Sequence, residues 1–258
     1  MFRLAVVVSL LISAVCAAAA TASTSDASAV TLAQQSLAAL TGRVPVADVT
    51  LNANVISIFG SDAETGTATL EAKGTGESRV DLSLSGGTRS DVRNLVNGGP
   101  GGAWTKNGGT STAYAQHNCW TDAAWFFPAL SSLTQTGNQN FIFKYIGQEQ
   151  HGGVNTQHIQ VFQVGPQANS SLQRLSTLDF YLDPNSSLPL AVAIKAHADN
   201  DANTDIPTEF RFANYQAVNG IQVPFHVQQM LNGTVVLDIT VTNAVFNTGL
   251  QDSLFTLQ

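Results

Sequence analysis

Residues 117–130, HNCWTDAAWFFPAL, form the densest cluster of chemically distinctive side chains in this sequence. The thiol of Cys119 and the imidazole of His117 are the residue types of a nucleophile and its general base. A spacing of two places both side chains on one face of a strand but separates them on a helix. A buried, inert cysteine explains the same residues, and we expect this rather than catalysis.

The rest of the sequence offers little for catalysis. It contains no G-x-S-x-G, H-E-x-x-H, G-x-G-x-x-G or P-loop motif. His151 and His158 flank a Gly-Gly turn that can bring them together, although exposed hairpin histidines are the more common outcome. Asp199 and Asp201 lie in the polar segment HADNDANTD, which we expect to be a solvated loop rather than a cation site or an acid-base pair. We therefore predict a non-enzymatic protein with no catalytic residues, metal or cofactor.

The same segment has a second interpretation as a helical cover. Asn118 can cap a short helix with Asp122 in its first turn, and Pro128 can begin a second one. A helix that is apolar on nearly every side must be buried or must face an apolar ligand. We predict such a cover over about residues 118–134. Its candidate ligand contacts are the four aromatic residues Trp120, Trp125, Phe126 and Phe127, for which ordinary core packing is the alternative.

The N-terminus has the build of a cleavable secretory signal. Residues 1–22 combine one cation, an apolar run and a small-residue ending at Ala22. An uncleaved anchor helix is one alternative, because the run approaches spanning length. Lipid attachment at Cys16 is another, but Val15 and Ser13 stand where a small residue and a leucine are usual. We expect cleavage, a periplasmic or secreted protein, and no membrane span thereafter.

Charge and cysteine content exclude several kinds of partner and site. Removal of the signal leaves 10 cations against 18 carboxylates. An acidic chain without a basic run cannot bind the phosphates of nucleic acid well. Cys119 is then the single thiol, so an intramolecular disulfide and a cysteine-based zinc site are excluded by count.

Hydrophobic periodicity predicts one helix followed by many strands. Residues 29–41 have a helical apolar stripe that ends before Gly42. After Pro45 the period changes to two, and Asn-Gly pairs at 97, 107, 219 and 232 indicate hairpins. We expect about six strands over residues 46–116 and five or six over 140–258, about eleven in all. They would form one strongly curved antiparallel sheet in a single domain, residues 23–258.

The C-terminal third resembles the closing strands of LolA-like periplasmic proteins. In that family a "Y…NG…P" strand-turn-strand leads to an "N-x-G-x-x-D-x-x-F" ending. The residues that match are Tyr215, Asn219, Gly220, Pro224, Asn247, Gly249, Asp252 and Phe255. YLDPNSSLPLAVAI, residues 181–194, is similar to the family's central hairpin. The resemblance is sharp only from about residue 178, and its motifs are structural.

This resemblance implies an incomplete β-barrel with an apolar concave side covered by helices. Members carry or sense lipoproteins, lipids or glycolipids in the periplasm. We accordingly expect a carrier or sensor of a lipid, acyl chain or other hydrophobic ligand. An envelope protein is a further possible partner, and its identity is open. Candidate wall residues are Phe141, Phe143, Phe180 and Leu182. The alternative is a structural or interaction module whose barrel is filled by its own side chains.

Overall fold

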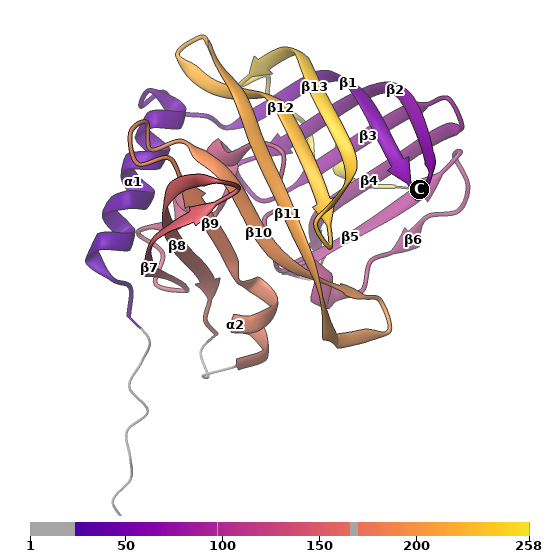
Figure 1. The fold of residues 1–258 in the computed structure, drawn as a ribbon. Helices are drawn as coiled ribbons and strands as arrows, with labels where there is room; N and C mark the ends of the chain where they lie inside the picture. The colour runs from indigo at the N-terminus through magenta and orange to yellow at the C-terminus, as the bar shows by residue number, and fades with distance from the viewer. Residues whose placement is uncertain (1–23, 97, 166–169, 258) are drawn as a thin grey trace, which may run out of the picture.

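The computed structural model describes residues 24–96, 98–165 and 170–257, and it contains one large antiparallel sheet (Figure 1). The predicted signal, residues 1–22, lies outside the described residues. The first block of strands comprises β1 (Asp48–Phe59), β2 (Asp62–Lys73), β3 (Ser78–Leu84), β4 (Gly87–Val96), β5 (Gly99–Lys106) and β6 (Thr112–Ala113). The second block comprises β7 (Phe141–His151), β8 (Val154–Gln163), β9 (Leu178–Leu182), β10 (Pro189–Ala198), β11 (Asp201–Val218), β12 (Ile221–Leu231) and β13 (Thr234–Phe246).

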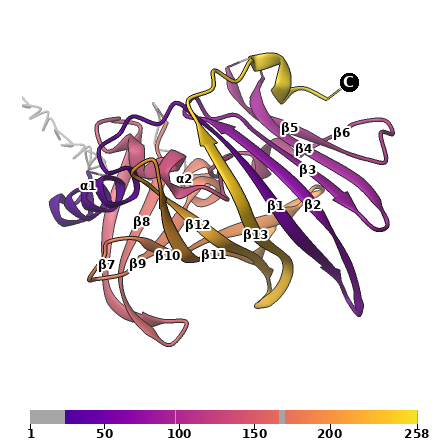
Figure 2. The ribbon, with the colours of Figure 1, turned by 90° about the horizontal axis from the view of Figure 1, so that it is seen from above.

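The mainly β, strongly curved and unclosed sheet that we predicted is confirmed. Its described strands follow the order β6-β5-β4-β3-β2-β1-β13-β12-β11-β10-β9-β8-β7, so each block is a meander. The two blocks are joined where the first strand pairs with the last, with Val49 opposite Phe246 and Ser57 opposite Leu237. Figure 2 shows the blocks as two arms of a bent sheet. The described chain has thirteen strands where we expected about eleven.

The polar segment HADNDANTD also differs from our expectation. We expected a loop there, but β10 continues to Ala198 and β11 begins at Asp201. The Asp201 carboxylate accepts hydrogen bonds from the backbone N–H of Asn203 (2.8 Å) and from the Thr204 hydroxyl (2.6 Å). Polar side chains that bond to one another within a hairpin are therefore compatible with strands, although their composition is typical of loops.

The matched C-terminal residues have structural roles. Asn247, with φ 57°, follows β13, and its amide side chain accepts from the Ala47 backbone (2.7 Å) and donates to the Pro45 carbonyl (3.0 Å). The Asp48 carboxylate accepts from the backbone N–H groups of Thr248 (2.7 Å) and Gly249 (2.9 Å). These bonds fix the end of β13 beside the start of β1, where the two blocks meet.

The N-terminal helix closes one end of the second block. Helix α1 (Ala27–Thr41) buries Ala29, Ala33, Ser36 and Leu40, and it contacts β7, β8 and β12. Since β7 and β12 are not neighbours in the sheet, the block must curl for one helix to reach both. Gly42 ends the helix in the left-handed region, with φ 57°. None of the described helices is long and apolar enough to span a membrane.

The predicted cover is present between β6 and β7, but it is not the helix that we expected at Asn118. The connector, which we define as residues 114–140, contains three 3-10 helices: η1 (Gln116–Asn118), η2 (Pro128–Leu130) and η3 (Ser132–Gln135). Residues 119–127 between them form turns and bends. Asp122 is therefore in no helical first turn, and its carboxylate accepts instead from the Ser132 backbone (3.0 Å) and hydroxyl (3.2 Å). A helix does begin at Pro128, as predicted.

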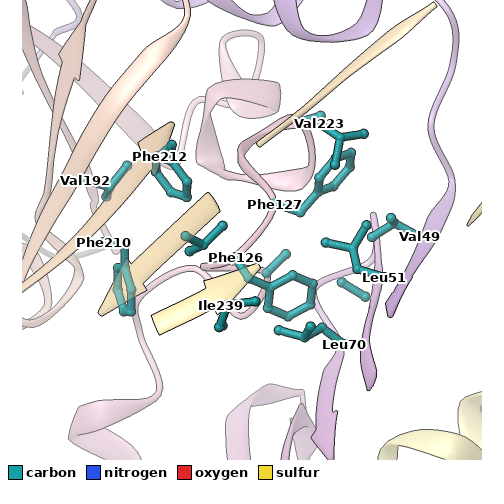
Figure 3. Close-up of a cluster of buried hydrophobic side chains, with 14 of the residues drawn as sticks. Val49, Leu51, Leu70, Phe126, Phe127, Val192, Phe210, Phe212, Val223 and Ile239 are labelled. Carbon is teal, nitrogen blue, oxygen red and sulfur yellow. The ribbon is translucent and has the colours of Figure 1, made fainter. Parts of the chain in front are cut away.

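The connector supplies the centre of the core. Phe126 and Phe127 have no exposed surface. Figure 3 shows Phe126 beside Leu51 and Leu70 of the first block, whereas Phe127 lies beside Val223 of β12. One short segment therefore fills the space between the two arms of the sheet.

Candidate functional site

A cleft of about 920 Å³ lies between the inner faces of the two strand blocks. Its walls come from β2–β5 on one side and β9–β13 on the other, and connector residues 114–131 line it between them. The apolar lining includes Val80, Leu82, Trp125, Val192, Phe210 and Phe212. A volume of this size falls within the range of about 300–1,000 Å³ that is typical of ligand pockets.

Strand register explains the character of the wall in the first block. Successive residues of a strand point to opposite faces, so residues that pair across strands share a face. One such row runs Leu70, Val80, Asp91 and Trp104 across β2–β5, and the next runs Ala68, Leu82, Arg89 and Lys106. The inner face is thus apolar on β2 and β3 and becomes charged on β4 and β5.

Of the four predicted cover residues, Trp125 is the one that lines the cleft. Its indole is half-buried and stacks on Phe210, with ring centroids 4.8 Å apart and planes at 23°. It also contacts the edge of Phe126, with centroids 5.5 Å apart. Trp125 therefore joins the buried core to the cleft surface.

The other predicted cover residues lie elsewhere. Phe126 and Phe127 belong to the closed core and do not line the cleft. Trp120 is half-buried outside the cleft lining, and its carbonyl accepts from Gln163 Nε2 (3.0 Å). Ligand contact by these three residues stays a prediction, and in this structure it would require the connector to move.

The predicted wall residues also lie in the core. Phe143, Phe180 and Leu182 are almost completely buried, and Phe141 is partly buried against them. None of the four lines the cleft, although Leu178 of the same strand as Phe180 does. The lining of the second block comes mainly from β10 and β11, so ligand contact by the four predicted wall residues also stays a prediction.

Sequence reasoning missed two groups of lining residues. Phe210 and Phe212 alternate in β11, in the stretch TEFRFAN, and both face the cleft. Arg89, Asp91 and Arg93 alternate in β4, in TRSDVRN, and they face it too. Period-two alternation was visible in both stretches, but charges at the inward positions of β4 are typical of a solvent face.

The charged wall of β4 carries a partly buried carboxyl group that is hydrogen-bonded to the connector. Asp91 Oδ2 accepts a hydrogen bond from the Tyr114 hydroxyl. Burial raises the pKa of the Asp91 carboxyl to about 6, against the opposing effects of that hydrogen bond and of the Arg93 charge. Burial likewise raises the pKa of Asp122 to about 6. Nη2 of Arg93 is buried, and no described residue accepts a hydrogen bond from it.

Two residues before Asp91 on the same strand, the Arg89 guanidinium is engaged with other groups of the protein. Its guanidinium pairs with Glu64 (3.0 Å) and donates to the Ser57 hydroxyl (3.2 Å). It also lies 4.2 Å from the centroid of Phe59, a half-exposed ring at the end of β1. The charge and the N–H groups of Arg89 therefore already have partners within the protein, in contrast to those of Arg93.

Hydrogen bonds hold the connector against β10 at the other wall. Asn118 donates to the His197 carbonyl (2.8 Å) and accepts from the His197 amide (2.9 Å). The ring of His117 lies 3.0 Å from the Ala198 carbonyl. Asp205 forms ion pairs with Arg174 (2.7 Å) and Lys195 (2.7 Å) behind His197. The connector is thus fixed to the second block by its own side chains, which bond to the backbone of β10.

The groups that we considered for catalysis have structural partners. The Cys119 thiol lies 3.8 Å from the Ala115 carbonyl, and burial raises its pKa, which disfavours the reactive thiolate. His151 and His158 do not face each other but lie on the Tyr181 ring, with centroid distances of 3.6 and 4.6 Å. His158 is buried rather than exposed, and it pairs with Asp179 (2.8 Å). In the described part of the chain, no three His, Cys, Asp or Glu residues are placed to hold a metal.

Comparison of the whole fold with solved structures shows which proteins have a similar fold. A domain from Vibrio parahaemolyticus named for outer membrane lipoprotein sorting matches with a TM-score of 0.57 and 13% identity, over 88% of this chain and 96% of its own. A LolA superfamily protein from Nitrosomonas europaea matches with a TM-score of 0.53 and 9% identity, over 88% and 97%. The fold is LolA-like.

A DUF1329 family protein from Desulfovibrio piger has the LolA-like arrangement of this chain as well, with a TM-score of 0.56, 11% identity, and coverage of 90% and 98%. No protein-family model and no curated protein matches the sequence. The fold that the C-terminal motifs implied is thus confirmed by shape, at an identity too low to transfer any activity.

Proposed function

We propose that this protein is an exported, non-enzymatic carrier or sensor that holds a lipid, acyl chain or other hydrophobic ligand in the cleft. The observation that carries the proposal is the cleft itself, which is open between the two arms of the sheet and lined by apolar side chains of both. The LolA-like fold supports it, because similar structures include a domain named for lipoprotein sorting.

The energetics of binding are consistent with a reversible carrier. Burial of an acyl chain stabilises a complex by roughly 0.8 kcal/mol per methylene, or on the order of 10 kcal/mol gross for one chain. Loss of translational and rotational freedom offsets a large share of this. Roughly micromolar affinity is therefore a reasonable expectation.

An apolar fluorescent dye tests the proposal. The wild-type protein should enhance the emission of an environment-sensitive naphthylamine dye, and Trp125→Ala should weaken dye binding roughly tenfold because a stacked lining ring is lost. Trp120→Ala is the matched control, since this half-buried tryptophan lies outside the lining. Phe127→Ala should instead destabilise the fold by about 3–5 kcal/mol. A wild-type protein that never binds the dye would rule out the carrier.

A structural or interaction module remains the second candidate. It is favoured by the extent to which the protein fills its own interior, since Phe126, Phe127, Phe180 and Leu182 are all fully buried. On this alternative the cleft would hold only water, and binding of the dye would be absent or unaffected by Trp125→Ala.

A further inference from the structure

The polar patch in the cleft, which we define as Asp91, Arg93, Tyr114 and Asp122, lies where strand β4 and the connector both line the cleft. All four side chains line the cleft. Asp91 and Arg93 come from β4, whereas Tyr114 and Asp122 come from the connector. The two chain segments therefore bring two carboxylates, a guanidinium and a phenol together at the cleft.

Arg93 is a donor without an acceptor. The Arg93 side chain lines the cleft, and none of the described residues accepts a hydrogen bond from its guanidinium, of which Nη2 is enclosed by the protein. A guanidinium N–H without an acceptor is costly to leave unsatisfied. The side chains of Arg93 and Tyr114 both lie close to Gly102: a Cβ there would be 2.8 Å from Arg93 Cδ and 3.2 Å from the Tyr114 ring. Gly102 thus leaves the space in which both side chains cross β5 towards the cleft.

Asp91 offers the complementary acceptor. Its Oδ2 accepts from Tyr114, while no donor from the described residues reaches Oδ1. The side chain is only partly buried and lines the cleft. Asp122 offers less, because the Ser132 amide lies within hydrogen-bond distance of both of its oxygens. A free donor and a free acceptor therefore stand on the same strand, two residues apart.

The charges around Asp91 and Arg93 disfavour a ligand whose head group is an ionised acid. Within the patch, one guanidinium stands against two carboxylates, and both carboxylates are mainly ionised at neutral pH. Over the whole cleft, the described lining residues include five carboxylates and four Lys or Arg side chains. An ionised head group would consequently find no surplus positive charge, and it would meet Asp91 as a like charge.

We propose that the cleft selects an amphiphile with an uncharged, hydroxyl-bearing head group, whose oxygen accepts from Arg93 and whose O–H donates to Asp91 Oδ1. A hydroxyl satisfies both groups at once, because it is both a donor and an acceptor. The apolar chain lies along Val80, Leu82, Phe210 and Phe212. This inference rests on the proposed function and names the class of ligand for the same site.

Competition between two lipids with the same acyl chain tests the head-group preference. Monooleoylglycerol and oleate each displace the naphthylamine dye from the wild-type protein at neutral pH, and the concentrations for half displacement are compared. We expect monooleoylglycerol to be effective at roughly tenfold lower concentration than oleate. Equal or better displacement by oleate overturns the inference while leaving the carrier function intact. If the dye does not bind, or neither lipid displaces it, the proposed function itself fails.

Asp91→Asn tests whether the patch sets this preference. The amide oxygen can still accept from Tyr114, but one negative charge and the free acceptor are lost. We expect weaker displacement of the dye by monooleoylglycerol and stronger displacement by oleate. The ratio of the half-displacement concentration of oleate to that of monooleoylglycerol should therefore fall roughly tenfold. Asp252→Asn is the control, because its side chain is 86% exposed on the 3-10 helix Asp252–Phe255. An unchanged ratio in a folded Asp91→Asn protein contradicts the proposal, since the dye reports binding independently of the head group.

Discussion

At the scale of single residues, position relative to the cleft separates the aromatic side chains that only support the fold from those that can meet a ligand. Trp125 and Phe127 are two positions apart in the same connector, yet Trp125 lines the cleft whereas Phe127 is enclosed by the core. Composition alone could not distinguish them, because both lie in one apolar stretch. The distinction depends on turns at residues 119–127 that replace the expected helix.

The raised pKa of Asp122 predicts how the stability of the protein depends on pH. Burial raises its folded-state pKa to about 6 from 3.8, so folding disfavours the ionised carboxylate. The cost is fully present above about pH 6 and is relieved as the pH falls towards the unfolded-state value. We expect the stability of the wild type relative to Asp122→Asn to rise by about 1–3 kcal/mol between about pH 7 and pH 4. Urea unfolding of both proteins measures this, and a difference that is constant or falls contradicts it.

At the scale of elements, the meeting point of α1 with the sheet depends on one glycine. Gly42 has φ 57°, and a Cβ there would lie 2.6 Å from the Gly220 carbonyl oxygen in the turn between β11 and β12. Gly60 is a matched control, because it has φ 60° with no atom within 4 Å of its ideal Cβ. The two positions share the same backbone strain and differ in the contact.

We therefore predict that Gly42→Ala destabilises the protein by more than Gly60→Ala. The control should cost about 1 kcal/mol for the left-handed backbone alone. The additional clash at Gly42 should roughly double that cost or exceed it, because a backbone carbonyl cannot move as a flexible side chain does. Thermal unfolding of both variants measures the two losses of stability. Equal losses would contradict the prediction, because they would mean that α1 can move away from the β11–β12 turn without an energetic cost.

The elements also show what local sequence can predict. Alternation and Asn-Gly turns predicted the strands well, and Asn219 and Asn232 do adopt positive φ, 52° and 49°, in the turns before β12 and β13. The connector was harder, since its path is set by distant partners: Asn118 by His197, and Trp125 by Phe210. Such contacts have no local periodicity.

At the scale of the whole molecule, the cleft depends on how the two meanders are joined. The β1–β13 pairing is between strands nearly two hundred residues apart, which no local pattern predicts. The motif residues Asn247 and Gly249 stabilise that junction through Pro45, Ala47 and Asp48. The family resemblance could therefore predict the open barrel, while the lining of its cleft needed the three-dimensional arrangement.

The most direct test of the carrier is native mass spectrometry of the full chain purified from its own host without detergent. We expect a mass above that of the processed polypeptide, and release of a lipid with an uncharged, hydroxyl-bearing head group on organic extraction. Trp125→Ala should reduce the bound fraction, whereas Trp120→Ala should not. A wild-type protein that is repeatedly empty, and that takes up no apolar dye afterwards, would contradict the central claim that the cleft between the strand blocks holds a hydrophobic ligand.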